Sequence, residues 1–142
     1  MKITSRFTVA VHTLLAIYFF GKDYKTTSEF LASSVNVNPV IIRRTLQSLK
    51  AAGFIEVKAG SGGAEIIKDI VDITLYDIYK AADCVEGGLF NFHENPNPEC
   101  PVGKNIHIIL DEHLLSAQTA MENSLKAVTL ADLAKRLKEC NK

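Results

Sequence analysis

The stretch TTSEFLASSVNVNPVIIRRTLQSLKAAG, residues 26–53, decides the fold of this 142-residue chain. Thr26 is followed three positions later by Glu29, which is the spacing of a capping box, so we expect a short helix from there to about Ser34. The next three residues, Val35-Asn36-Val37, predict a tight turn.

A second helix is expected directly after this turn. Asn38 can cap its N-terminus, and Pro39 suits its first position, where a missing N–H costs nothing. Gly53 predicts the end of the helix, because glycine readily adopts the left-handed conformation found there. Two short helices joined by a tight turn make a helix-turn-helix.

The second helix has an apolar face and a polar face. The apolar face, which we expect to be buried, consists of Ile42, Leu46 and Leu49. The opposite face consists of Val40, Arg43, Arg44 and Gln47. Arginine can bind guanine or phosphate, glutamine can bind adenine, and valine can contact a thymine methyl group. A solvated helix face would have the same composition, so the surrounding elements must decide between the two interpretations.

Those surrounding elements predict a winged helix-turn-helix. A first helix begins at Thr4 or Ser5 and runs to about Phe20, with apolar residues at helical spacing. Residues 54–58 and 65–68 read as short strands separated by a glycine-rich turn, which predicts a hairpin, the wing. The expected fold class is mainly α with a small β-hairpin wing, which favours the DNA-reading interpretation.

The charge distribution agrees with a nucleic-acid partner. The net charge is zero, but residues 1–68 carry nine Lys or Arg against four Asp or Glu, a net +5. Residues 69–142 carry seven against twelve, a net −5. Such asymmetry indicates that one half meets a polyanion. Lys58 and Ser61 of the hairpin are candidates for contacts with phosphates.

Several other classes of protein are excluded or disfavoured. No apolar run is long enough to span a bilayer, and the N-terminus lacks the pattern of a signal peptide, so we expect a cytoplasmic protein with no membrane partner. The three cysteines, Cys84, Cys100 and Cys140, are too widely spaced for a disulfide framework or a zinc ribbon.

The second half of the chain predicts a loop and a long helix. Residues 83–103 are rich in proline and glycine, and a helix is expected from Pro101 or Asn105 to Lys126. Thr74 with Asp77, and Thr129 with Asp132, have the spacing of capping boxes and predict a short helix on either side of this segment. The apolar stripe of the long helix exceeds what a small winged domain needs for its core, so we expect it to pair with a second copy. The predicted organisation is a DNA-binding domain at 1–82, a sensor loop at 83–103, and the dimerisation helix with a C-terminal helix at 104–142.

Five segments together resemble the Rrf2 family of bacterial winged-helix regulators. They are Ile3-Thr4-Ser5-Arg6-Phe7, Ser28 to Val35, Leu46 to Ile55, the Gly60-x-Gly62-Gly63 wing, and Ile73-Thr74-Leu75-Tyr76-Asp77-Ile78. The resemblance implies a homodimer that binds a palindromic operator in double-stranded DNA. It also implies that Ser5 and Arg6 touch the DNA backbone. The chain departs from the family at Glu65, where tyrosine commonly follows the glycines and where a carboxylate would repel phosphate.

The expected DNA contacts combine the helix-turn-helix, the wing and the start of the first helix. They are Ser5, Arg6, Thr26, Ser28, Asn38, Pro39, Val40, Arg43, Arg44, Gln47, Lys58 and Ser61.

The signal that controls this DNA binding has more than one interpretation. Many family members hold a [2Fe–2S] cluster on three cysteines in the loop before the dimer helix, but this chain has only Cys100 there, so we expect no cluster, metal or other cofactor. Cys100 stands where a helix N-terminus would favour the thiolate, and the segment resembles cluster-free members with a redox-active lone cysteine. Alternatively, Cys100 is structural and the signal is an effector near Phe90 and Phe92 or a metal held by His93, Cys100 and His107.

The sequence therefore predicts a sequence-specific DNA-binding transcriptional regulator, expected to be a repressor and responsive to thiol oxidation through Cys100. The alternatives are a regulator that responds to an effector or a metal, and a winged-helix module that binds only proteins. An enzyme with Cys100 as the nucleophile is not expected, because no oxyanion-type glycine loop or orienting third residue accompanies it.

Overall fold

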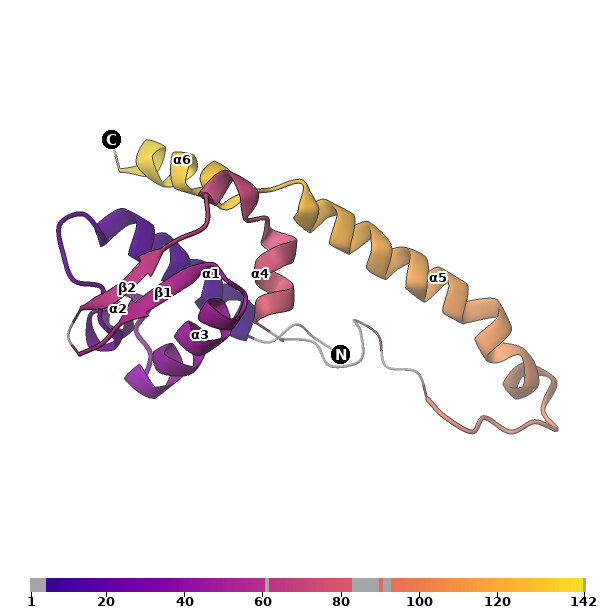
Figure 1. Ribbon diagram of the computed structural model, residues 1–142. Helices are drawn as coiled ribbons and strands as arrows, with labels where there is room; N and C mark the ends of the chain where they lie inside the picture. The colour runs from indigo at the N-terminus through magenta and orange to yellow at the C-terminus, as the bar shows by residue number, and fades with distance from the viewer. Residues whose placement is uncertain (1–4, 61, 83–89, 91–92, 142) are drawn as a thin grey trace.

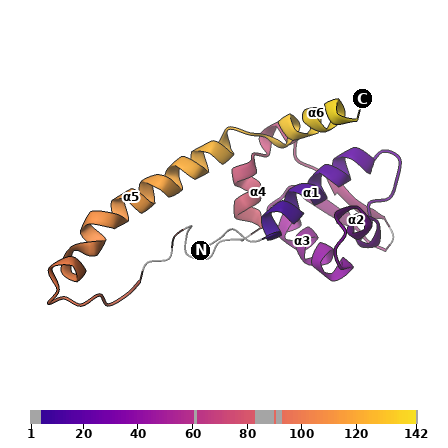
Figure 2. The ribbon, with the colours of Figure 1, turned by 180° about the vertical axis from the view of Figure 1, so that it is seen from behind.

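The structure, a computed structural model, describes residues 5–60, 62–82, 90 and 93–141. Its elements in chain order are α1 (Ser5–Phe20), α2 (Ser28–Val35), α3 (Pro39–Ala51), β1 (Ile55–Lys58), β2 (Gly63–Ile66), the 3₁₀ helix η1 (Ile70–Asp72), α4 (Leu75–Ala81), α5 (Pro101–Lys126) and α6 (Leu130–Cys140). All of these except α5 form one head, and α5 projects from it as a long arm (Figures 1 and 2). The predicted fold class, mainly α with a hairpin wing and a long C-terminal helix, is confirmed.

The core of the head forms around α1. Leu14 of α1 is fully buried, as are Leu31 of α2 and Ile78 of α4. The predicted apolar face of α3 joins them, since Ile42, Leu46 and Leu49 are all buried. Each large apolar side chain buried in this way contributes about 1.5–3 kcal/mol to stability. The opposite face of α3 is thereby fixed toward solvent.

The ends of α3 were predicted correctly, and the start of α2 was not. Asn38 caps α3 by accepting a hydrogen bond from the Val40 backbone N–H at 2.9 Å, and Gly53 adopts a φ of 82° after the helix. Thr26 does not cap α2. The cap is Thr27, whose hydroxyl accepts from the Phe30 N–H at 3.2 Å.

Thr26 instead fastens the wing to α2. Its side chain is 2% exposed and its hydroxyl donates to the carbonyl oxygen of Ala64 at 2.6 Å. The Ala64 N–H in turn donates to the Thr26 carbonyl at 3.0 Å. This pairing places the start of β2 at Gly63, two residues before the predicted Glu65, because the strand must reach back to meet residue 26.

The wing is a two-stranded antiparallel hairpin, with Ile55 opposite Ile66 and Lys58 opposite Gly63. Gly63 has a φ of 79°, and a Cβ at this position would lie 2.8 Å from the Thr26 backbone nitrogen. Only glycine fits both the backbone conformation and this close approach.

The last helices begin at two capping boxes that were both predicted. Thr74 with Asp77 caps α4, and Thr129 with Asp132 caps α6. The two threonines also form a β-bridge with each other, which sets α6 beside the start of α4. Neither the short helix η1 nor the packing of α6 against α1 was predicted. Among the described residues, no helix has the length and apolar character that crossing a membrane requires.

The arm α5 has 26 residues and is therefore about 39 Å long. It packs on its own head through α4, and its residues packed against the core are Met121 and Leu125, both near its C-terminal end. None of its residues is fully buried. The N-terminal half lies away from the head in both views (Figures 1 and 2).

Candidate nucleic-acid interface

The polar face of α3 forms the centre of the candidate interface. Val40 is 45% exposed, and Arg43, Arg44 and Gln47 are exposed as the sequence predicted. Ile41, which was not among the predicted contacts, is also 42% exposed. Since the core fixes the other side of this helix, the exposed side chains form a continuous projecting surface.

One flank of α3 faces the start of α1. A cavity of about 410 Å³ lies between the two helices, and its wall includes Ser5, Arg6 and Arg44. These three residues were predicted to contact DNA from separate parts of the chain, and the fold brings them to one place. The two arginines make this flank basic.

The other flank of α3 faces α2 and the wing. A cavity of about 350 Å³ here is lined by Ser28, Arg43 and Lys58 among others. Ser28 is the first residue of α2, so its neighbourhood includes unpaired backbone N–H groups that favour an anion. The fold therefore places predicted contacts on both sides of α3.

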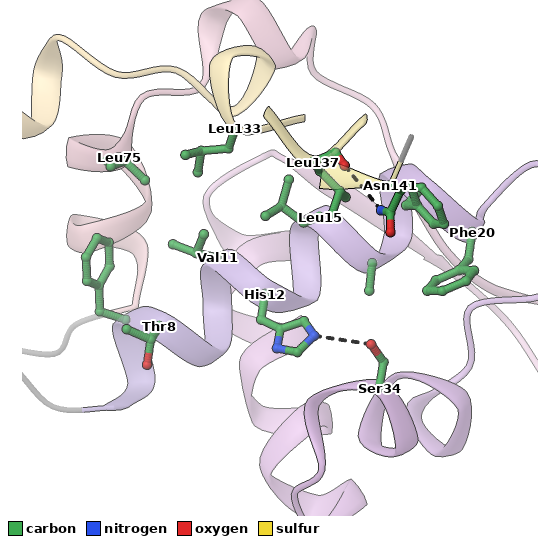
Figure 3. Close-up of a pocket in the computed structure, with 13 residues that line it drawn as sticks. Thr8, Val11, His12, Leu15, Phe20, Ser34, Leu75, Leu133, Leu137 and Asn141 are labelled. Atoms are coloured by element: carbon green, nitrogen blue, oxygen red, sulfur yellow. Dashed lines mark hydrogen bonds between the residues drawn. The ribbon is translucent and has the colours of Figure 1, made fainter. Parts of the chain in front are cut away.

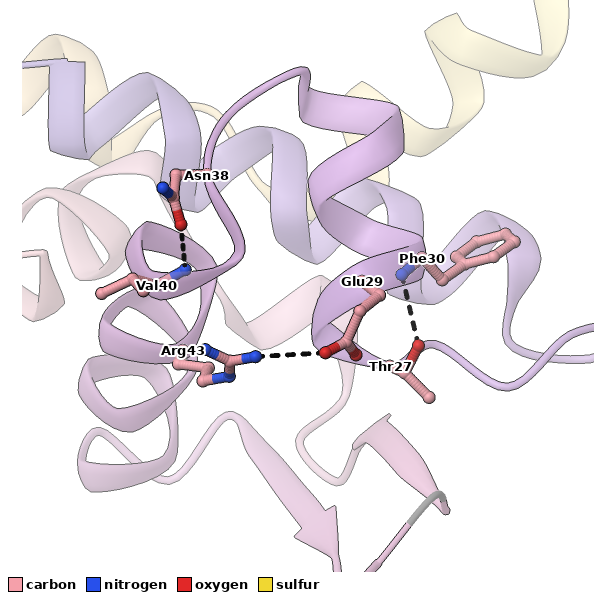
Figure 4. Close-up of polar contacts among 6 residues, drawn as sticks. All are labelled: Thr27, Glu29, Phe30, Asn38, Val40 and Arg43. Carbon is pink, nitrogen blue, oxygen red and sulfur yellow. Dashed lines mark hydrogen bonds and ion pairs between the residues drawn. The ribbon is translucent and has the colours of Figure 1, made fainter.

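Arg43 is tied to an acidic neighbour. Its Nη2 lies 3.1 Å from Oε1 of Glu29 (Figure 4), and both side chains are largely exposed. Glu29 was expected to form a capping box with Thr26, and this ion pair was not predicted. Residues 29 and 43 are on different helices, and no periodicity connects them. Without DNA, the charge of Arg43 is partly neutralised by Glu29.

The wing carries a second ion pair. Lys58 Nζ lies 3.4 Å from Oε2 of Glu65 on the opposite strand. The carboxylate that departs from the family pattern is therefore engaged with the lysine expected to meet phosphate. Ser61, the other expected phosphate contact in this part of the chain, lies outside the described residues.

Thr26 is not available for the DNA contact that the sequence predicted. It is buried, and its hydroxyl is used in the bond to Ala64. Asn38 and Pro39 keep their predicted place at the start of α3, where the Asn38 side-chain oxygen accepts from Val40 and the residue stays exposed (Figure 4).

Cys100 occupies the N-cap position of α5, as predicted, and is half-buried. Hydrogen bonds from the backbone N–H of Gly103, and then of Val102, hold the pKa of its thiol below the ordinary value. These donors favour the thiolate because they stabilise its charge.

Two histidines meet beside this helix end. The ring centroids of His93 and His107 are 5.5 Å apart, and His107 Nδ1 lies 3.1 Å from a carboxylate oxygen of Asp111. Phe90 is half-buried, whereas Phe92 and Cys84 lie outside the described residues.

The chain is similar to known regulators over nearly its whole length. Residues 3–136 match the family described as "Rrf2: Iron-dependent Transcriptional regulator". YwnA of Bacillus subtilis (strain 168), named as a candidate HTH-type transcriptional regulator, is 47% identical over 135 residues, which are 95% of this chain and 98% of YwnA.

Solved structures show the same similarity. The crystal structure of a candidate DNA-binding protein is 41% identical, with a TM-score of 0.71, and covers 91% of this chain and 98% of its own. The T. potens IscR structure has a TM-score of 0.73 at 16% identity and covers 100% and 92% of the two chains, a likeness of fold alone.

The described residues do not fit an iron site. No three His, Cys, Asp or Glu side chains among them lie close enough together to hold a metal ion. His93 and His107 approach each other, but Asp111 engages the ring of His107 rather than completing a set of ligands.

Proposed function

The chain belongs to the Rrf2 family of transcriptional regulators, and we propose that it binds a palindromic operator as a homodimer, through α3, the wing and the start of α1. Its relatives and its family are regulators and not enzymes. The proposed domain organisation is a DNA-binding domain at 1–82, a sensor loop at 83–103, and a dimerisation arm with α6 at 104–142. We infer that it acts in the cytoplasm as a repressor, since a dimer on an operator excludes other proteins from that DNA.

One observation carries the proposal: the exposed face of α3 is flanked on both sides by cavities that are each lined by two cationic side chains. Arg6 and Arg44 line one cavity, and Arg43 and Lys58 line the other together with Glu29. A helix in the major groove has phosphates on either side of it, which is where these cations lie relative to α3. We expect Val40 and Gln47, which lie on the exposed face between them, to meet base edges.

The dimer is supported by α5. Its N-terminal half exposes large apolar side chains, among them Val102 at 64% and Ile109 at 59%. A contiguous apolar surface of this kind usually marks an interface with another protein. A two-fold dimer also supplies two copies of α3 for the two half-sites of a palindrome.

Selection from a pool of random duplexes with the purified chain tests the proposed function. We expect enrichment of an inverted repeat whose half-sites are about one helical turn apart. The affinity for that duplex should fall steeply with salt, because bound phosphates release counterions. Failure to enrich any sequence, or binding that does not respond to salt, would contradict the proposal.

The ion pair between Glu29 and Arg43 gives a specific prediction. Glu29→Gln removes a carboxylate that competes with DNA for Arg43, so we expect operator affinity to rise about two- to fivefold, the strength of an exposed ion pair. Fluorescence anisotropy with the selected duplex measures this. Glu139→Gln is the matched control, since Glu139 pairs with Arg136 on α6 at 3.4 Å. Weaker binding by the Glu29 variant would show that this carboxylate supports the interface.

Cys100 is the proposed sensor within this regulator. Its thiolate attacks an oxygen of hydrogen peroxide, the O–O bond breaks, and hydroxide leaves. The sulfur loses two electrons and becomes a sulfenic acid. Cys100 stands at the start of the dimerisation arm, so a new polar group there would alter how two copies are held.

We expect peroxide to weaken operator binding of the wild type by about tenfold, a typical coupling between two sites, and Cys100→Ser to abolish this response. The lowered pKa also predicts that alkylation of Cys100 stays fast as the pH falls below the range in which an ordinary thiol reacts. Fluorescence anisotropy measures the change in operator binding, and mass spectrometry measures the rate of alkylation. Cys140→Ser, at an exposed thiol on α6, should leave the response intact. An unchanged response in Cys100→Ser would make Cys100 structural.

A further inference from the structure

An outer cavity of about 600 Å³ lies between the wing, the C-terminal end of α1 and the loop that joins α1 to α2. Three lysines line it, Lys22, Lys25 and Lys58, against one acidic residue, Glu65. Of these four residues, only Lys58 is among the expected DNA contacts. The outer cavity therefore has a basic wall that the proposed interface leaves unused.

This gathering of cations is a local feature of the head. A larger cavity, of about 670 Å³, runs as an apolar groove between α1 and α6. Val11 and Leu15 face Leu133 and Leu137 across this groove (Figure 3). None of the described residues that line it carries a permanent charge. Cations thus collect beside the wing rather than in every hollow of the head.

The outer cavity adjoins the cavity between α3 and the wing. Thr26, Lys58 and Ala64 line both of them. The stem of Lys58 passes over Gly62, since a Cβ on this glycine would lie 2.5 Å from the Lys58 Cβ. Gly62 lines the outer cavity and not the other one. The lysines of the outer cavity therefore continue the basic surface that begins beside α3.

The loop that carries Lys22 and Lys25 is held to the rest of the head. Tyr24 lies between the two lysines, and its ring stacks on that of Phe30 in α2, with the centroids 5.5 Å apart. Thr26, the residue after Lys25, is buried and bonded to the wing. The lysines thus project from a backbone that is already ordered, so binding an anion costs little conformational entropy.

The charges of the loop and the wing are complementary to different partners. Neither Lys22 nor Lys25 forms an ion pair within the part of the chain that the structure describes, and both are exposed. Lys58 is instead paired with Glu65. The hairpin at 55–66 contains two glutamates against this one lysine, a net −1. A hairpin of negative net charge binds phosphate poorly, and the loop beside it supplies the positive charge that it lacks.

The position of the outer cavity in the head decides which part of the DNA it meets. α5 joins the head through α4, and the wing lies at the end of the head away from α5 in both views (Figures 1 and 2). In a dimer held by the two arms, this end of each head points away from the two-fold axis. DNA that continues past a half-site therefore passes the outer cavity.

We propose that Lys22 and Lys25 bind phosphates of the duplex just beyond each half-site, on the outer side of the wing. This inference rests on the operator binding of the proposed function and extends the bound duplex at both ends. The contacts are independent of base sequence, because phosphates carry no sequence information directly. They also hold the wing against the DNA in spite of the carboxylate of Glu65.

Duplexes of two lengths test this proposal with the full chain. The short duplex ends at the outer edges of the selected half-sites, and the long duplex adds about ten base pairs, one helical turn, at each end. We expect the wild type to bind the long duplex about tenfold more tightly, or better, because additional phosphates release their counterions. Scrambling the added base pairs should not change this gain.

Alanine at both lysines should remove the gain. For Lys22→Ala combined with Lys25→Ala, we expect equal affinity for the two duplexes and a salt dependence on the long duplex that falls by about four phosphate contacts in each dimer. Arginine at both positions should keep the gain, because it carries the same charge and also binds phosphate. Lys135→Ala combined with Lys138→Ala, at two exposed positions on α6, is the matched control and should behave as the wild type.

The outcomes separate this inference from the proposed function. Absence of salt-dependent binding to either duplex would overturn the proposed function itself. Equal binding of the two duplexes by the wild type, or a gain that survives in the alanine variant, would overturn the flanking contacts alone. An equal loss on both duplexes in the alanine variant would place the lysines over the half-site and would likewise overturn them.

Discussion

Replacing both Arg43 and Arg44 with alanine is expected to weaken operator binding by roughly a hundredfold or more, the largest effect on function that the structure predicts. Each arginine contact to a base or phosphate contributes about 1–3 kcal/mol to binding. The two side chains project from α3 into different flanks, so their losses should be nearly additive. Anisotropy titrations with the selected duplex, repeated at several salt concentrations, measure the change.

The single variants should differ in the size of their effect. Arg44 shares its cavity with Arg6 and Ser5, the expected backbone contacts, so Arg44→Ala should weaken binding to all sequences and reduce the salt dependence. Arg43 is paired with Glu29 in the absence of DNA, so Arg43→Ala should weaken binding less than Arg44→Ala. Arg136→Ala on α6 is the control, since that arginine is exposed and distant in sequence from the interface. Binding by the double variant within twofold of wild type would exclude α3 as the reading helix.

Local signals in the sequence were sufficient for most of the helix ends. The capping boxes at Thr74 and Thr129, and the Asn38 cap of α3, were predicted correctly because each depends on residues within one turn. The buried face of α3 was predicted from its 3.6-residue period alone. The long arm α5 was likewise visible from its apolar stripe.

The features that were missed depend on contacts between distant segments. Thr26 and Thr27 are equivalent candidates for the cap, and the choice is made by Ala64, which takes up the Thr26 hydroxyl from 38 residues away. The ion pair of Glu29 was missed for the same reason, because its partner lies on another helix. The groove between α1 and α6 forms because α6 returns to α1 across most of the chain, which no local pattern predicts.

The attachment of the wing gives the prediction with the largest effect on stability. Gly63→Ala should lower the free energy of unfolding by about 3 kcal/mol or more, from backbone strain together with overpacking. Its φ of 79° is unfavourable for any L residue with a Cβ, and that Cβ would meet the Thr26 backbone nitrogen at 2.8 Å and carbonyl carbon at 3.0 Å. Because Thr26 and Ala64 are held together by two hydrogen bonds, the clash can be relieved only by moving the wing away from α2.

Gly53→Ala is a matched control, because it separates the two causes. Gly53 has a φ of 82°, but nothing lies within 4 Å of the position that its Cβ would take. This variant should therefore lose only about 1–2 kcal/mol, the cost of the left-handed backbone. Urea unfolding at one protein concentration compares the free energies of unfolding of the two variants. Equal losses would mean that the wing moves to accommodate the added Cβ with no loss of stability. A larger loss in Gly63→Ala, together with weaker operator binding by its folded fraction, would show that the junction of Thr26 and Ala64 sets the position of Lys58 beside α3.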